Sequence, residues 1–448
     1  MKQILNRTKS LLLLAILPYF LLAQYSIQLQ PSELPNWRPY NQDGINVFEP
    51  QKNLNTGDFT RGIRFGAGFT QQFQSLSHEN ASGAAALYPR LGSGFSIAQA
   101  NLYMDAVLAE GITLNVTTYL SARHHNEAWV KGGYIQVDKL PFKGMFWDKL
   151  MNKMTFKLGH MEINYGDQHF RRSDGGHTLY NPFIENYIMD AFATEVAGEA
   201  YYHAGPFLGM LGVSNGLING GYQKSYLLTQ TGVDSSKYLK RNPSVYAKLA
   251  WQNHINDHVQ ARIGLSGYFN KHDGRSTLYG GDRTGSNYFF VLEPASATSK
   301  DNAFSGRYNP SFTNEIRAIQ LNAFVKAYGF ELFGTFENAA GRTNREIYVT
   351  KADARSANQI GIDLVYRFCK NENFFVGARY NSVSGKLIAE NQDKQKIDRI
   401  ALGAGWLVTK SIMLKGEYVQ QKYTDFPKAN IYDGGKFNGV TVEAVVGF

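Results

Sequence analysis

Cysteine is nearly absent from this chain: Cys369 is the single one among 448 residues. One thiol cannot form an internal disulfide framework, so a fold stapled by disulfides is excluded. Long apolar runs are absent after residue 24, which excludes a transmembrane helix in the rest of the sequence. The formal net charge of +9 is spread along the chain, and this excludes a basic arm that binds nucleic acid.

The N-terminal segment has the features of an export signal. Basic residues at positions 2, 7 and 9 precede an apolar run over 11–22, and the small Ala23 follows. The run is shorter than the ~20 residues that a membrane-spanning helix needs. We therefore expect residues 1–23 to be a cleaved signal peptide. Subtracting its three positive charges from +9 leaves a mature chain of about +6.

The rest of the sequence is dominated by residues that alternate between apolar and polar or small. In "QIGIDLVYRF" (359–368), every second residue from Ile360 to Phe368 is apolar, and Gly361, Asp363 and Arg367 lie between them. A period of two is typical of a β-strand with one apolar face. We count sixteen such segments, over residues 61–74, 96–109, 111–123, 128–138, 154–165, 187–203, 206–216, 242–254, 257–271, 312–328, 329–338, 357–370, 372–383, 395–408, 411–423 and 436–448.

Connections of two kinds alternate between these segments. Short turns such as "LAEG" and "KAYG" are followed by long loops, which we expect over residues 75–95, 166–186, 217–241, 272–311, 339–356, 384–394 and 424–435. This asymmetry, an even strand count and lipid-like faces on nearly every strand predict an all-β fold, a transmembrane antiparallel barrel of sixteen strands over residues 61–448. A soluble β-sandwich or β-helix would not explain so many apolar faces.

The chain ends within a strand, "NGVTVEAVVGF", on Phe448. A closed barrel must pair its last strand with its first, because an open edge in lipid leaves backbone groups unsatisfied. We expect the first segment to supply that partner through Ile63, Phe65, Ala67 and Phe69. Phe448 would then lie at the periplasmic interface, where aromatic rings anchor a barrel.

The ending "VTVEAVVGF" resembles that of bacterial outer-membrane proteins, whose terminal Phe is read by the barrel-assembly machinery. A wider resemblance covers most of the mature chain. The order of "QANLYMDAVLAEGITLNVTTYLSA", "GGYIQVDKL", "TFKLGHMEINYG" and a long third loop is similar to sixteen-stranded porins, and among them to the phosphate-selective porin O and P family. The resemblance implies a trimer in the bacterial outer membrane, in contact with lipid and lipopolysaccharide, and selectivity from basic residues of the lumen.

Basic and acidic residues both occupy the faces that we expect to line the lumen. The basic positions are Arg64, Arg123, Lys157, Lys248, Arg262, Lys326, Arg367, Arg379, Arg399 and Lys415. The acidic positions are Asp105, Glu331, Glu337, Asp363, Glu417 and Glu443. The balance is cationic but mixed, so the resemblance does not fix phosphate as the solute.

The third long loop, "GDQHFRRSDGGHTLYNPFIENY" (166–187), is the richest in charge. In porins this loop folds into the lumen and sets the constriction, which makes Arg171, Arg172, Asp174 and Asp167 the candidate constriction residues. The two arginines offer planar donors to a passing anion. Alternatively, the loop charges pair with one another and with the wall. Both interpretations stay open at this stage.

No motif points to an enzyme, a cofactor or a metal. "VSNG" (213–216) resembles part of the serine–histidine motif of outer-membrane phospholipase, but Gly212 stands where that motif has histidine, so Ser214 lacks a base. The pairs His124–His125 and His169–His177 do not complete a set of four metal ligands. Small residues of the lumen face explain "GAG" (403–405).

Two regions depart from the strand pattern. Residues 24–60 contain several prolines, which predicts an irregular leader that lies in the periplasm or folds into the barrel mouth. Residues 139–153, "KLPFKGMFWDKLMNK", make a long inner connection. Its apolar residues fall near helical spacing among four lysines, so it is either a short interfacial helix or a covered turn at a subunit contact.

These patterns together predict an outer-membrane porin, a water-filled channel for small hydrophilic solutes with a modest preference for anions. The alternatives are an uptake channel specific for a sugar or a hydrophobic nutrient, or a structural barrel closed by its loops. Tyr103, Tyr119, Tyr246 and Tyr268 would favour a sugar track if they form one column on the lumen face.

Overall fold

The computed structural model describes residues 28–29, 34–53, 61–89, 91–121, 128–174, 177–217, 226–229, 231–238, 241–281, 286, 288–389, 391 and 393–448. The expected signal peptide, residues 1–23, lies outside the described residues. In the described part, no helix is long and apolar enough to cross a membrane.

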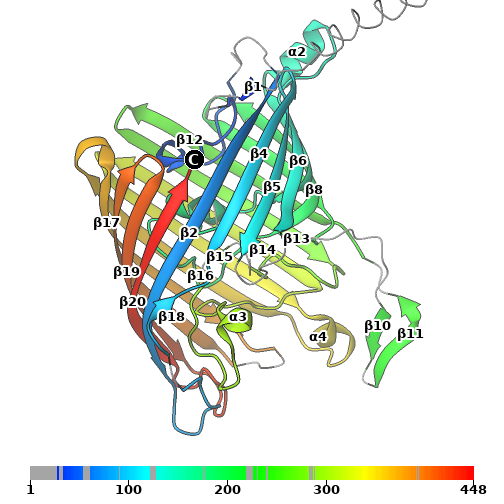
Figure 1. The fold of residues 1–448 in the computed structure, drawn as a ribbon. Coiled ribbons are helices and arrows are strands. Elements are labelled where there is room, and N and C mark those ends of the chain that lie inside the picture. Colours follow the sequence, from blue (N-terminus) through cyan, green and yellow to red (C-terminus); the bar gives the residue numbers. More distant parts are fainter. Residues whose placement is uncertain are drawn as a thin grey trace, which may run out of the picture.

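Sixteen antiparallel strands of the described chain form one closed barrel (Figure 1). They are β2 (Gly62–Glu79), β4 (Gln99–Ala109), β5 (Ile112–Ser121), β6 (Ala128–Val137), β7 (Met154–Glu162), β8 (Thr194–Ala204), β9 (Phe207–Ser214), β12 (Ser244–Asn256), β13 (Val259–Lys271), β14 (Glu315–Ala327), β15 (Phe330–Arg342), β16 (Arg355–Phe368), β17 (Phe374–Gly385), β18 (Gln395–Thr409), β19 (Ile412–Thr424) and β20 (Lys436–Gly447). Each overlaps one predicted segment, so the predicted barrel is confirmed.

The barrel closes where β2 pairs with β20, but in a different register from the one that we expected. Residues 68–79 of β2 pair with β20, whereas residues 62–70 pair with β4. Ile63 and Phe65 are therefore paired with β4 and not with the last strand. Ala67 exchanges two backbone hydrogen bonds with Phe448, at 2.9 and 3.0 Å. The shift follows from the stagger between neighbouring strands that barrel closure requires. The two-residue strand β1 (Gln28–Leu29) pairs in parallel with Gly62 and Ile63, at the start of β2.

Short connections gather at one end of the barrel and long ones at the other. The short-turn end has two-residue turns at 110–111, 205–206, 257–258, 328–329 and 410–411. At 328–329 both Tyr328 (φ 50°) and Gly329 (φ 87°) are left-handed, as in a type I′ turn, whose twist matches the twist of its strands. Figure 1 shows the C-terminus and β1 at this end, and α3 (Ser299–Asn302), α4 (Asn344–Tyr348) and the hairpin β10–β11 (Tyr226–Thr229 and Gly232–Tyr238) at the long-loop end.

The outer face of the barrel is apolar, as the alternation predicts. In β16–β18, Leu364, Ala378 and Leu402 are cross-strand neighbours, and Leu364 and Leu402 are each 53% exposed. Toward the short-turn end, rings of the outer face follow one another with centroids 4.3–6.0 Å apart. They belong to Phe330, Tyr366, Phe368, Phe374 and Trp406. Such rings are typical of the girdle that a barrel presents to a membrane interface.

The long inner connection contains the helix α2 (Met145–Met151) at the short-turn end (Figure 1). Phe142, just before the helix, and Met145 and Phe146, in its first turn, are exposed. The segment thus contains a helix, as the first of the two alternatives expected, and its place at a membrane interface or a subunit contact stays a prediction.

Three segments fill the lumen. Residues 34–53, with the short 3-10 helix η1 (Gln42–Gly44), enter from the short-turn end. The described residues of loop 163–193 and of loop 272–314 enter from the long-loop end. The predicted strand over 187–203 is wrong at its start, because β8 begins at Thr194 and residues 187–193 belong to the loop. The backbone N–H groups of Ile188 and Met189 donate to wall amides, to Asn381 Oδ1 at 2.6 Å and Gln359 Oε1 at 2.8 Å, instead of to a neighbouring strand.

Candidate functional site inside the barrel

Wall side chains fix loop 163–193 inside the barrel by binding its backbone. Lys415 Nζ donates to three carbonyls, those of Thr178, Asn181 and Phe183, at 2.8–3.1 Å. Glu417 accepts a hydrogen bond from Ile184 N at 2.7 Å. The described residues of the loop pair with no strand, so these charged groups satisfy backbone groups that would otherwise be buried without hydrogen bonds.

Arg171 and Arg172 are neighbours in sequence but reach different partners. Arg171 ends the 3-10 helix η2 (Gln168–Arg171) and is 1% exposed. Its guanidinium donates to Asn46 Oδ1, and its Nη2 lies 3.4 Å from Glu331 of the wall. The Asn46 amide, from the N-terminal segment, and the Glu331 carboxylate, from the wall, thus both face the Arg171 guanidinium.

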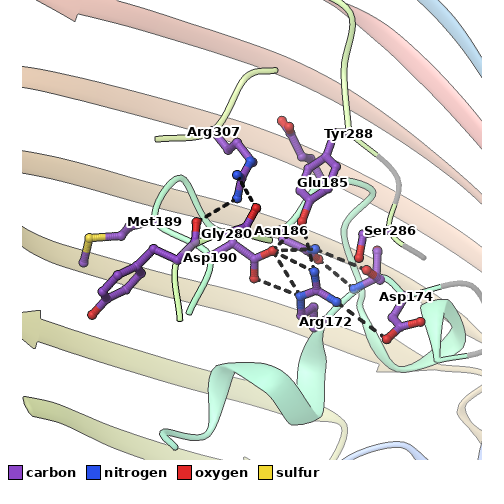
Figure 2. Close-up of polar contacts among 12 residues, drawn as sticks. Arg172, Asp174, Glu185, Asn186, Met189, Asp190, Gly280, Ser286, Tyr288 and Arg307 are labelled. Atoms are coloured by element: carbon purple, nitrogen blue, oxygen red, sulfur yellow. Dashed lines mark hydrogen bonds and ion pairs between the residues drawn. The ribbon is translucent and has the colours of Figure 1, made fainter. Parts of the chain in front are cut away.

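Arg172 makes a bidentate contact with Asp190 of the same loop. Its Nε and Nη2 donate to the two carboxylate oxygens at 2.9 and 2.8 Å, and Nη2 also contacts Tyr288 Oη at 3.0 Å (Figure 2). Asp174 lies 3.6 Å away as a second carboxylate. Burial acts to lower the pKa of Arg172, but Asp190 outweighs it and raises that pKa. Both candidate constriction arginines are thus buried beside carboxylates.

The two candidate aspartates are also in ion pairs. Asp167 accepts from Arg262 Nε and Nη2 at 2.8 Å each, and its Oδ1 lies 3.1 Å from Lys248 Nζ. Asp174 accepts from Lys131 Nζ at 2.6 Å and from Asn101 Nδ2 at 2.9 Å. The structure therefore brings each loop aspartate to a different part of the wall.

The wall cations that we predicted show the same pairing. Arg123 lies outside the described residues. Eight of the other nine have a carboxylate partner within 3.4 Å, in the pairs Arg64–Asp105, Lys248–Glu49, Arg262–Asp167, Lys326–Glu372, Arg367–Glu331, Arg379–Asp363, Arg399–Glu185 and Lys415–Glu443. Lys157 is in no ion pair with any described residue.

Sequence reasoning missed the partners that come from distant segments. Asn46 and Glu49 lie in the N-terminal leader, Asp190 in a stretch assigned to a strand, and Tyr288 in loop 272–314. The sequence contains many acidic residues, and nothing in it indicates which carboxylate pairs with which basic side chain. Glu185, also in loop 163–193, is enclosed so fully that burial raises its pKa to about 8, although Arg399 acts in the opposite direction.

A cavity of about 220 Å³ lies between the N-terminal segment, loop 163–193 and the wall around β4–β8. Its lining combines aromatic rings, among them Trp37, Tyr103, Tyr134 and Tyr201, with charged side chains and amides such as Asn164. Burial lowers the pKa of His177, which also lines it, to about 4.

The four lumen tyrosines do not form one column. Tyr246 and Tyr268 stack with centroids 6.0 Å apart, whereas Tyr103 stacks on Tyr40 of the N-terminal segment at 4.4 Å. Tyr119 contacts Trp129. The condition that we set for a sugar track is therefore not met.

The weaker candidates also have structural contacts. Ser214 donates to Glu195, and His169 contacts Glu162 and Asn164. The pair His124–His125 lies outside the described residues. Within the described part, no group of three or more His, Cys, Asp or Glu residues has the geometry to hold a metal ion.

No protein-family model matches the chain, and no curated protein matches it. Among solved structures, the anion-selective porin from Comamonas acidovorans is similar with a TM-score of 0.51 and 12% identity, over 87% of this chain and 100% of that one. OprB of Pseudomonas putida (TM-score 0.48, 11% identity, 86% and 94% covered) and the outer membrane channel DcaP of Acinetobacter baumannii (0.47, 9%, 88% and 99%) are also similar. At such identities the likeness concerns the fold, which is porin-like. The phosphate-selective family stays a prediction.

Proposed function

We propose that this protein is an outer-membrane channel for small hydrophilic solutes. The observation that carries the proposal is a closed barrel that has an apolar outer face and a charged lumen into which a loop folds. On β18, for example, Leu402 lies on the outer face and Arg399 on the lumen face. An apolar outer face on a barrel without open edges suits contact with lipid. The short-turn end then faces the periplasm and the long loops face outward.

The channel has a modest preference for anions, and Lys157 is the residue that best supports it. Arg171 and Arg172 lie beside carboxylates, so each offers little net positive charge to a passing ion. Lys157 lines the cavity and has no counterion among the described residues. Since salt screens distant charges within ~8–10 Å, an unpaired ammonium beside the path affects ion passage more than paired wall charges do.

Planar-bilayer recordings test the proposal. We expect discrete conductance steps and a reversal potential on the chloride side in a KCl gradient. Lys157→Met should move that potential toward potassium, and Lys326→Met, which removes a lysine paired with Glu372, should move it less. A potassium-selective wild type, or equal shifts in both variants, would contradict the anion preference.

A second candidate function is a structural barrel closed by its loops. It is favoured by apolar packing between loops 163–193 and 272–314, where Ile184, Met189, Leu278 and Phe289 are fully buried. Absence of conductance from folded, inserted protein at all voltages would favour this candidate over a channel.

The proposed setting follows from the proposed channel. The chain is exported by a signal peptide over residues 1–23, inserted by the barrel-assembly machinery, and surrounded by lipid and lipopolysaccharide as a homotrimer. It needs no cofactor and catalyses no reaction. Native mass spectrometry of the detergent-extracted protein tests the trimer.

A further inference from the structure

Lys157 is unusual among the basic side chains of the lumen wall. It projects from β7 into the cavity, and its Nζ lies 5.6 Å from the ring centroid of Tyr134 and 5.1 Å from that of Tyr201. These distances are within the ~6 Å of a cation–π contact. Neither contact neutralises the charge.

The carboxylate that faces Lys157 across the sheet is engaged by other groups. Glu199 stands opposite Lys157 in the register of β7 and β8. Its carboxylate instead accepts hydrogen bonds from Asn164 N at 3.0 Å, Tyr201 Oη at 2.5 Å and Tyr246 Oη at 2.9 Å.

The carboxylates that line the cavity are engaged elsewhere too. Glu49 is held by Lys248 and Arg262, and each of the other three has its own partner. Those pairs are Asp138–Lys52, Glu162–His169 and Asp174–Lys131. The other cation of the lining that lacks a carboxylate, Arg38, donates to the carbonyls of Gly44 and Phe170. Lys157 is thus left with positive charge for a ligand.

Rings surround this charge. Tyr134 stacks with Trp37 of the N-terminal segment at 5.8 Å, and Tyr201 stacks with His203 at 6.5 Å. These four rings and Lys157 all line the cavity. Flat apolar walls beside one ammonium group suit a ligand with a flat apolar body and one negative charge.

We propose that this cavity binds a small aromatic carboxylate, with the carboxylate on Lys157 and the ring against the Trp37–Tyr134 wall. Its volume of about 220 Å³ is below the ~300–1,000 Å³ of sites for drug-sized ligands, so it fits a solute of one ring. As a substrate site it rests on the proposed channel, whereas the binding itself does not.

Calorimetric titration of the detergent-folded protein with sodium benzoate tests the site. We expect saturable binding, at least tenfold weaker for benzamide, which lacks the charge, and for acetate, which lacks the ring. Lys157→Met should weaken benzoate binding at least tenfold. Lys157→Arg keeps the charge and should retain most of it, and Lys326→Met should leave it unchanged.

Trp37 supplies a local reporter, because a ring bound beside it changes its fluorescence. Benzoate should alter the emission of the wild type and not that of Trp37→Phe, which keeps an aromatic ring in place. Equal affinity for benzoate and benzamide, or unchanged affinity in Lys157→Met, would overturn the proposal.

The same preparations separate the two proposals in a bilayer. Benzoate binding without conductance leaves the site standing and removes the channel. Conductance without saturable benzoate binding leaves the channel standing and removes the site.

Discussion

Glu49 Oε2 lies 2.7 Å from Nη2 of Arg262, which joins the N-terminal segment to the wall of the barrel by an ion pair. The other oxygen of Glu49 lies 3.1 Å from Lys248 Nζ. Burial acts to raise the pKa of Glu49, but Arg262 and Lys248 outweigh it and hold that pKa well below its usual range. The leader is therefore part of the lumen's charge network.

Glu49→Ala should loosen this segment. Removing one partner of a buried ion pair costs ~3–5 kcal/mol, and we expect the lower end of that range because Asp167 stays beside both cations. The heat-modifiability midpoint should fall and the conductance should rise. Asp43→Ala is the matched control, since its pair with Lys410 is exposed and should contribute ~0–1 kcal/mol. Equal midpoints for the two variants would show that Glu49 does not anchor the leader.

Phe448 should matter for assembly through its ring and its backbone. It exchanges two hydrogen bonds with Ala67, and its side chain is 57% exposed on the outer face. Deletion of Phe448 should lower the amount of heat-modifiable protein in the outer membrane. Phe448→Tyr keeps the ring and the backbone hydrogen bonds, and should assemble normally. Phe448→Ala keeps the backbone hydrogen bonds without the ring, so it measures the contribution of the ring alone. Wild-type levels in the deletion variant would contradict this role.

Leu402→Arg should destabilise the barrel strongly. Leu402 lies in the middle of β18 on the outer face, where an arginine costs ~2–4 kcal/mol at the bilayer midplane. Gln420→Arg, on the same face toward the long-loop end of β19, should cost ~0–1 kcal/mol. Folding into lipid vesicles at increasing urea concentration measures the free energy of folding of both variants. A larger cost for Gln420→Arg would mean that the membrane depth is assigned wrongly.

The structure also rejects a control that the sequence would suggest. Gly403 faces the lumen, as expected, and looks like a harmless site for serine. However, a Cβ there would lie 3.2 Å from Pro182 O and 3.3 Å from the Phe183 ring, so loop 163–193 would have to shift. Alternation along β18 reveals the face of Gly403, but no local pattern reveals the loop behind it.

The same contrast between local patterns and contacts between distant segments holds for the whole molecule. The strands were predictable because a period of two is a local property, and it located all sixteen. The start of β8 was not, because residues 187–193 are mostly apolar, as a buried strand can be, while their backbone binds Asn381 and Gln359. The pairing of Glu49 with Lys248 joins residues far apart in the chain, which no single segment encodes.

His177 should make the lumen packing sensitive to acid. Its ring stacks on Tyr103 and lies tilted against Tyr180, with centroids 5.3 Å apart in both contacts, and burial lowers its pKa to about 4. The unfolded chain takes up a proton near pH 6.5, whereas the folded one does so only near pH 4, so stability present above pH 6.5 is lost as pH falls through this window. The charged groups that act on His177 are Asp174, Glu162, Arg38 and Lys131.

The heat-modifiability midpoint at pH 7.5 and pH 5 measures this effect. His177→Phe keeps a ring but cannot take a proton, so its midpoint should fall less than that of the wild type. The carboxylates around it are common to both proteins. An identical fall in both would assign the acid sensitivity to other groups.

Reversing the loop charges with Arg171→Glu/Arg172→Glu should disrupt the loop before it changes selectivity. The new carboxylates would lie beside Glu331 and Asp190, and like charges buried together are strongly unfavourable. We expect a lower heat-modifiability midpoint and irregular conductance. Arg171→Gln/Arg172→Gln is the milder test, and Arg275→Glu, an exposed position of loop 272–314, is the control that should leave both readouts unchanged. Arg283, in the same loop, lies outside the described residues. A stable Glu double variant with a clean shift toward potassium would mean that these arginines form the filter directly and that their ion pairs contribute little to the fold.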